Sequence, residues 1–91
     1  MNVNINFYGP LEKWVGKKSF TTGGNTIYEV LASLENQIGK SVLGHLLNSH
    51  GKLKSHFHIL LNGLDIEALD GLKTKVKDGD VITCVPPVGG G

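Results

Sequence analysis

Residues 26–39, TIYEVLASLENQIG, decide the fold, because they predict one well-capped amphipathic helix in the middle of the chain. Thr26 and Glu29 match the capping-box pattern: the threonine hydroxyl accepts from the amide at the third helical position, and the glutamate reaches back to the cap. Gly39 suits the left-handed position that ends a helix. An apolar stripe follows helical spacing: Ile27, Val30, Leu31, Leu34 and Ile38. This stripe is expected to face the core.

Short strand-like segments lie on both sides of this helix. Near the N-terminus, Val3, Ile5 and Phe7 alternate with polar residues, the period-two pattern of a strand with one buried face. Asn62-Gly63 is a strong signal for a tight hairpin, because both residues tolerate positive φ. The expected strands are residues 2–8, 17–22, 56–61, 64–67 and 81–85.

The connections between the strands are expected to be mostly irregular. We predict a longish loop that contains Trp14 between the first two strands. A shorter second helix is expected from about residue 41 to 49, and residues 68–77 are expected to form a loop with at most one helical turn.

The element order indicates an α+β fold, in which one helix crosses one mixed sheet of about five strands. A helical crossover lets the first and last strands pair in parallel at the centre of the sheet. On this topology, the residues after the last strand would leave from the middle of the sheet.

Composition excludes several classes of protein. The chain has 91 residues, 40% of them hydrophobic, which is enough for one domain with a modest core. No apolar run reaches the roughly 20 residues of a membrane span, and no secretory signal is expected at the N-terminus. The net charge is +1, and all nine basic residues are scattered lysines, so we expect no nucleic-acid partner and no membrane partner. Cys84 is the only cysteine, which excludes an internal disulfide and suits a cytoplasmic location.

The sequence ends in Val85-Pro86-Pro87-Val88-Gly89-Gly90-Gly91. Glycine loses the most backbone freedom on folding and buries no side chain, so three glycines add little to a folded domain. They would allow a thin chain to enter a channel that Cβ atoms would block, with Gly91 carrying the reactive carboxylate. Two prolines would make the base of that chain stiff and extended. A frayed terminus or a sequence left by cloning is the alternative explanation.

The last third of the chain resembles the MoaD/ThiS group of ubiquitin-like sulfur carriers. The residues that carry the resemblance share the order of a hairpin, a DGD turn, a short apolar strand and a Pro-Pro-Val-x-Gly-Gly ending: Leu61-Asn62-Gly63, Asp65-Ile66, Leu69-Asp70-Gly71-Leu72, Thr74, Val76, Asp78-Gly79-Asp80, Val81-Ile82 and Pro86 to Gly91. Many members of the molybdopterin branch have aromatic residues where this chain has Cys84-Val85, and residues 40–55 look longer than in the smallest members.

This resemblance implies a β-grasp domain over residues 1–85 and an extended, flexible tail over residues 86–91. It implies that the Gly91 carboxylate is adenylated by a ubiquitin-activating-type enzyme and becomes a thiocarboxylate. The sulfur would pass to a sulfur-accepting synthase in cofactor (molybdopterin-type) or related biosynthesis. The activating partner would use ATP and magnesium, and the chain itself would bind no cofactor or metal. The predicted channel-binding residues are Pro86, Pro87, Val88, Gly89 and Gly90.

Other chemistry-bearing residues have two interpretations each. Cys84 could relay sulfur or serve as an attachment point, but an unpaired cysteine is more often a buried strand residue. His56 and His58 would share one side of a strand and could begin a zinc site, yet no third ligand is evident. A solvent-facing pair is the simpler interpretation, and this face could meet a partner. The chain has four histidines: His45, His50, His56 and His58. Trp14 and Tyr8 could anchor a partner or close the core.

Four functions remain to be distinguished. A sulfur carrier is preferred because of the resemblance. A protein modifier joined through Gly91 to a lysine would use the same activation step and the same ending. A binding subunit could insert its tail into a partner without being activated. A stand-alone enzyme is disfavoured, because the sequence lacks a phosphate loop and a nucleophile-elbow pattern.

Overall fold

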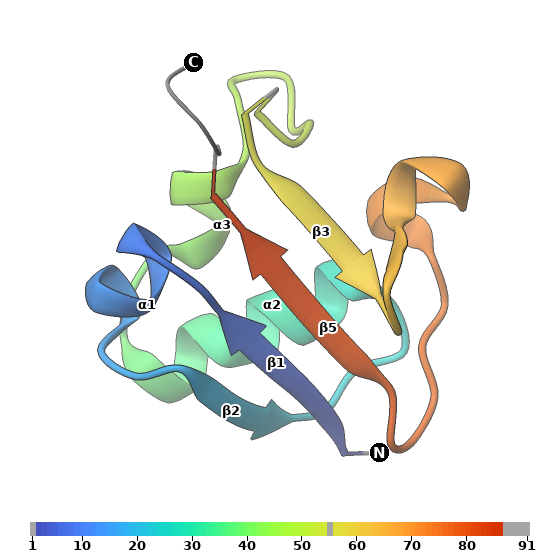
Figure 1. The fold of residues 1–91 in the computed structure, drawn as a ribbon, viewed down its shortest axis with the longest axis horizontal. Helices are drawn as coiled ribbons and strands as arrows, with labels where there is room; N and C mark the ends of the chain where they lie inside the picture. Colours follow the sequence, from blue (N-terminus) through green and yellow to red (C-terminus); the bar gives the residue numbers. More distant parts are fainter. Residues whose placement is uncertain (1, 55, 87–91) are drawn as a thin grey trace.

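The computed structural model describes residues 2–54 and 56–86. A five-stranded mixed sheet has the order β2-β1-β5-β3-β4, and helices cover one of its faces (Figure 1). The strands are β1 (Val3–Phe7), β2 (Ser19–Thr22), β3 (His58–Leu61), β4 (Leu64–Asp65) and β5 (Val81–Val85). The helices are α1 (Pro10–Val15), α2 (Ile27–Ile38) and α3 (Val42–Leu46), with 3-10 turns η1 (Ile66–Ala68) and η2 (Gly71–Lys73).

The first and last strands pair in parallel at the centre, which confirms the predicted topology. In this pairing, Asn4 lies opposite Val81 and Phe7 lies opposite Cys84. On its other side, β5 pairs antiparallel with β3, and β1 pairs antiparallel with β2. The central strand β5 is therefore held from both sides along its length.

The central helix α2 begins and ends where its capping residues predict. The Glu29 amide donates to the Thr26 hydroxyl over 3.1 Å, as in a capping box. The Glu29 carboxylate, however, accepts from the Asn25 amide at 3.0 Å, one residue before the cap. Gly39 adopts the left-handed conformation with φ 71°, and its amide donates to the Glu35 carbonyl.

Residues 10–15 form the helix α1, which corrects the loop expected around Trp14. Pro10 occupies the start of the helix, where the missing N–H would have had no intrahelical partner. Leu11 and Val15 lie one helical turn apart and are both buried, so burial of this pair stabilises a short helix that has no strong sequence signal of its own. Gly16, with φ 104°, ends it.

Five elements are shorter than predicted: β1 and β2 begin at Val3 and Ser19 rather than at residues 2 and 17, β1 ends at Phe7, and three others are shorter for a local reason. Strand β3 begins at His58 rather than at residue 56, because His58 lies opposite Val85, the last residue of β5. Strand β4 ends at Asp65, whose carboxylate accepts from the Glu67 amide and starts η1. Helix α3 spans only 42–46, since Leu47 is extended and forms a β-bridge with Leu53.

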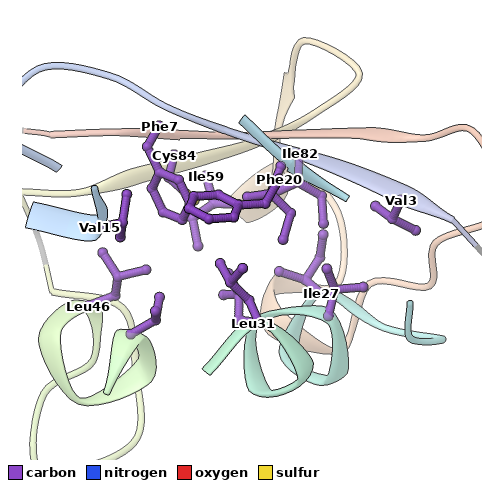
Figure 2. Close-up of a cluster of buried hydrophobic side chains, with 14 of the residues drawn as sticks. Val3, Phe7, Val15, Phe20, Ile27, Leu31, Leu46, Ile59, Ile82 and Cys84 are labelled. Atoms are coloured by element: carbon purple, nitrogen blue, oxygen red, sulfur yellow. The ribbon is translucent and has the colours of Figure 1, made fainter. Parts of the chain in front are cut away.

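The core lies between the sheet and the helices. Figure 2 shows Phe7, Phe20, Ile82 and Cys84 directed from the sheet toward α2 and α3. The sequence left open which alternate set of β5 faces inward, and the structure buries Ile82 and Cys84. Among residues 2–54 and 56–86, no helix is long and apolar enough to cross a membrane.

Candidate functional site

The C-terminal end of β5 positions the predicted site. Of the six residues assigned to it, Pro86 is described and is half-buried. Pro87, Val88, Gly89, Gly90 and Gly91 lie outside the described residues. The structure therefore defines the base from which the predicted reactive end begins.

This base is held by hydrogen bonds from both neighbouring strands. On one side, Val85 lies opposite His58 in the antiparallel β3–β5 pair. On the other side, the Tyr8 amide donates to the Cys84 carbonyl over 3.3 Å, just beyond the end of β1. A regular parallel ladder would next use an N–H from residue 86, and proline has none. The sheet therefore ends at Pro86.

Gly9 lies against the Pro86 ring. It connects β1 to α1 with φ 60° and ψ −138°. A Cβ atom at this position would lie 3.1 Å from Cγ of Pro86, closer than side-chain contacts normally come. The sequence showed Gly9-Pro10 only as the end of a strand, because nothing in a linear pattern indicates contact with a residue 77 positions later.

An aromatic cluster lies on the helical side of the fold. The Trp14 and His45 rings stack with centroids 4.2 Å apart and planes 15° apart, and the Phe57 centroid is 5.9 Å from that of His45. The Lys40 ammonium lies 5.7 Å from the Trp14 centroid and donates to the Trp14 carbonyl. Trp14 is half-buried and packs against the core. These contacts favour the core-closing interpretation of Trp14, and they give His45 a packing role.

Tyr8 is an exposed aromatic residue that directly precedes Gly9 in the sequence. Its side chain is 40% exposed, and the Lys18 ammonium lies 4.6 Å from its ring centroid. The contact is a cation–π interaction at a solvent-exposed site, which contributes on the order of 0.5–1 kcal/mol. Tyr8 remains available to a protein that approaches the end of β5.

Cys84 is a core residue. Its side chain is 1% exposed, and burial raises the pKa of the thiol to about 12. The thiolate is the nucleophilic form of cysteine, and this environment disfavours it at neutral pH. The structure thus supports the packing interpretation of Cys84 over sulfur relay or attachment.

The histidines do not assemble into a metal centre. His58 Nδ1 lies 3.1 Å from Asp65 Oδ2, with the His58 side chain 48% exposed. The Glu67 amide, and then His58, hold the pKa of Asp65 below its ordinary value. His50 and His56 are exposed. Within residues 2–54 and 56–86, no three histidine, cysteine or acidic side chains gather closely enough to bind a metal ion.

A groove that the sequence did not indicate lies between residues 50–53 and residues 66–73. Leu53, Ile66 and Leu72 contribute apolar surface to it, while lysine and acidic side chains both line it. This mixture indicates no single ligand charge. Among residues 2–54 and 56–86, the lining includes none from the end of β5.

Comparison with known proteins places these features in a family context. The model of the ThiS family matches residues 5–91. Small archaeal modifier protein 3 of Haloferax volcanii is 34% identical over 94 residues, with 100% of both chains covered. Sulfur carrier protein CysO of Mycobacterium tuberculosis is 36% identical over 93 residues, also with 100% of both covered.

A solved structure agrees with this. The chain is similar to one in the Amycolatopsis orientalis BexX/CysO complex, with a TM-score of 0.86 and 29% identity, over 98% of this chain and 99% of that one. The likeness confirms the β-grasp fold that the sequence resemblance implied.

Proposed function

This chain belongs to the ThiS family of ubiquitin-like sulfur carriers and small modifiers, and from that premise we propose that it carries sulfur as a thiocarboxylate on Gly91. The observation that carries the proposal is the family match, which continues through residue 91 and includes the predicted ending. In this function the chain is a substrate of partner enzymes and performs no catalysis itself.

The proposed chemistry solves the poor reactivity of a carboxylate. A Gly91 oxygen attacks the α-phosphorus of ATP, and pyrophosphate leaves, so that the carbonyl becomes part of a mixed anhydride. A sulfide-level donor then forms a C–S bond while the C–O bond to AMP breaks. ATP and magnesium are supplied at the activating enzyme, where the metal stabilises the charge on the phosphates.

The geometry of the described residues supports this use of the tail. Strand β5 is paired with β1 up to Cys84 and with β3 up to Val85, and Pro86 then ends the ladder. A narrow chain that starts from such a base loses less orientational freedom when it enters a channel than one that starts from a mobile loop. Pro86, Pro87, Val88, Gly89 and Gly90 are proposed to occupy the channel of the activating enzyme, where glycines allow contact through backbone amides.

We propose two classes of partner: a ubiquitin-activating-type enzyme and a synthase that accepts the sulfur in cofactor (molybdopterin-type) or related biosynthesis. The relative in the BexX/CysO complex is itself bound to a partner protein, which supports the idea of a partner here. A cytoplasmic location is proposed because the adenylation needs ATP and the step that follows needs a reduced sulfur donor.

A second function is favoured by one specific observation. The Haloferax volcanii relative is a small archaeal modifier protein, and it matches the whole of this chain. As a modifier, the chain would transfer its Gly91 acyl group from AMP to a lysine amine and form an isopeptide bond. Both functions share the adenylation step and differ in what attacks the acyl adenylate.

One experiment separates these functions. The protein is purified from its native host with its own C-terminus, and its intact mass is measured before and after alkylation of thiocarboxylates. Replacement of one oxygen by sulfur, lost when Gly91 is deleted, supports the carrier. Isopeptide adducts on lysines support the modifier. An unchanged mass, with no ATP–pyrophosphate exchange in the presence of the host's activating enzyme, would contradict both. His50→Ala, an exposed substitution outside the proposed channel-binding residues, is the matched control and should behave like the wild type.

A further inference from the structure

Gly9 occupies a position where a side chain is disfavoured for two separate reasons. Its φ of 60° lies in the region that residues with a Cβ rarely adopt. Independently, a Cβ there would meet the Pro86 ring at 3.1 Å from Cγ and 4.0 Å from Cδ. The first restriction concerns the path of the chain from β1 into α1. The second concerns only the base of the tail.

Pro86 has little freedom to move away from such a Cβ. Its ring fixes φ near −65°, so a displacement larger than a change of ring pucker moves the ring and the backbone together. The residue before it, Val85, is paired with His58, and the Cys84 carbonyl accepts from Tyr8. Because β5 is held from both sides, the part of the push that ring pucker does not absorb is relieved mainly at the point where the chain leaves β5, which turns the chain that follows.

We propose that Gly9 is a positioning residue that seats Pro86 and thereby sets the direction in which the tail leaves the sheet. The inference rests on the proposed function, in which that tail must reach a reaction centre. Five residues follow Pro86, and a chain of that length spans at most about 17 Å. If that chain is extended, a turn of about 10° at its base displaces the far end by about 3 Å. Misplacement by about 1 Å can lower a rate on the order of a hundredfold.

Gly16 provides a control for substitution of a glycine with positive φ at the other end of α1. Gly9 and Gly16 flank the same short helix, α1, and both have positive φ, 60° and 104°. A Cβ at Gly16 would meet nothing within 4 Å, whereas a Cβ at Gly9 would meet Pro86. Both Gly9→Ala and Gly16→Ala should lower the melting temperature, Gly9→Ala by more, because Gly16 lies in the left-handed helical region and Gly9, with ψ −138°, does not. Only Gly9→Ala should disturb the tail.

The functional readout is ATP–pyrophosphate exchange by the host's activating enzyme at varied carrier concentration. We expect Gly9→Ala to lower kcat/KM by about ten- to a hundredfold, with Gly16→Ala within about twofold of the wild type when both proteins are folded. Pro86→Ala removes the ring that the new Cβ would meet. In the Pro86→Ala background, adding Gly9→Ala should therefore have no more effect than adding Gly16→Ala.

A second readout does not depend on activation. In the free, isotope-labelled protein, Gly9→Ala should shift the NMR resonances of residues 86–91, and Gly16→Ala should leave them unchanged. Equal kinetic effects of the two alanine variants, or an undiminished Gly9→Ala effect in the Pro86→Ala background, would overturn the inference. If the wild type shows no exchange, the proposed function fails. The NMR comparison still tests whether Gly9 positions Pro86, because unchanged resonances of residues 86–91 in Gly9→Ala would refute that role.

Discussion

Asn62→Gly tests how the start of β5 is tied to the β3–β4 turn. The Asn62 amide N–H donates to the Val81 carbonyl over 2.8 Å, and the Asn62 side-chain oxygen accepts from the Val81 amide at 2.9 Å. The Asn62 Nδ2 group also donates to Asp80 over 3.1 Å. Asn62 has φ 52°, a conformation that glycine adopts freely. The substitution therefore keeps the turn and its backbone bond and removes only the two side-chain bonds.

The expected loss of stability follows from those two bonds. A neutral hydrogen bond contributes about 0.5–1.5 kcal/mol, and one to a charged group about 1.5–3 kcal/mol. Asn62 is exposed, so water replaces part of each interaction, and the lower ends of these ranges apply. We therefore expect the free energy of unfolding at pH 7 to fall by about 2 kcal/mol.

The pH dependence gives a sharper test. Asp80 is 6% exposed, and the Asn62 amide, followed by the Lys77 backbone N–H, holds the pKa of its carboxyl below the ordinary value. A carboxyl whose pKa is lowered by folding stabilises the protein above its unfolded pKa of about 3.9, and this contribution disappears as the pH falls through the folded pKa. The difference between wild type and Asn62→Gly should therefore shrink to about 1 kcal/mol in acid, where only neutral bonds remain.

The assay is urea unfolding followed by circular dichroism from pH 7 downward. Asp65, whose pKa is also lowered, contributes in the same direction in both proteins and cancels in the comparison. Asp80→Asn is the control background, in which Asn62→Gly should cost about 1 kcal/mol at every pH. A loss below about 0.5 kcal/mol at pH 7, which is the size of an ordinary surface substitution, would refute the reasoning, as would a loss that does not change with pH in the Asp80 protein.

Three further predictions concern α2, the core and Cys84. Thr26→Ala removes the acceptor of the Glu29 amide and should lower the free energy of unfolding by about 1 kcal/mol, whereas Thr26→Ser, which keeps the hydroxyl, should retain most of it; equal losses in urea unfolding would contradict the cap. Leu31→Ala leaves a cavity at a fully buried site and should lower the free energy of unfolding by about 2–5 kcal/mol in the same assay. A loss below about 1 kcal/mol would contradict tight packing at this site. Cys84 should react with a thiol reagent at neutral pH only as fast as the protein opens, since it is 1% exposed and the pKa of its thiol is raised to about 12; rapid labelling of the stable native protein would contradict its burial.

Local patterns with strong signals were sufficient for several elements. The helix over 27–38, its two ends, the Asn62-Gly63 turn and strand β5 are confirmed because the signal for each lies in neighbouring residues. Residues 10–15 were predicted wrongly as a loop, because a six-residue helix depends on burial of Leu11 and Val15 by distant residues. Likewise, the N-terminus of α3 is capped by Glu35 of α2, whose carboxylate accepts from the Leu43 amide.

The sequence by itself determined the element order, the family resemblance and the set of residues at which chemistry is proposed, because these properties lie in short runs of the chain. Only the tertiary structure decided that Ile82 and Cys84 face the core and that Trp14 stacks on His45. It also brought Gly9 against Pro86, across 77 positions of sequence. Such contacts form when the strands pair and the helices cover one face of the sheet. The free energy of this burial depends on residues that are distant in sequence.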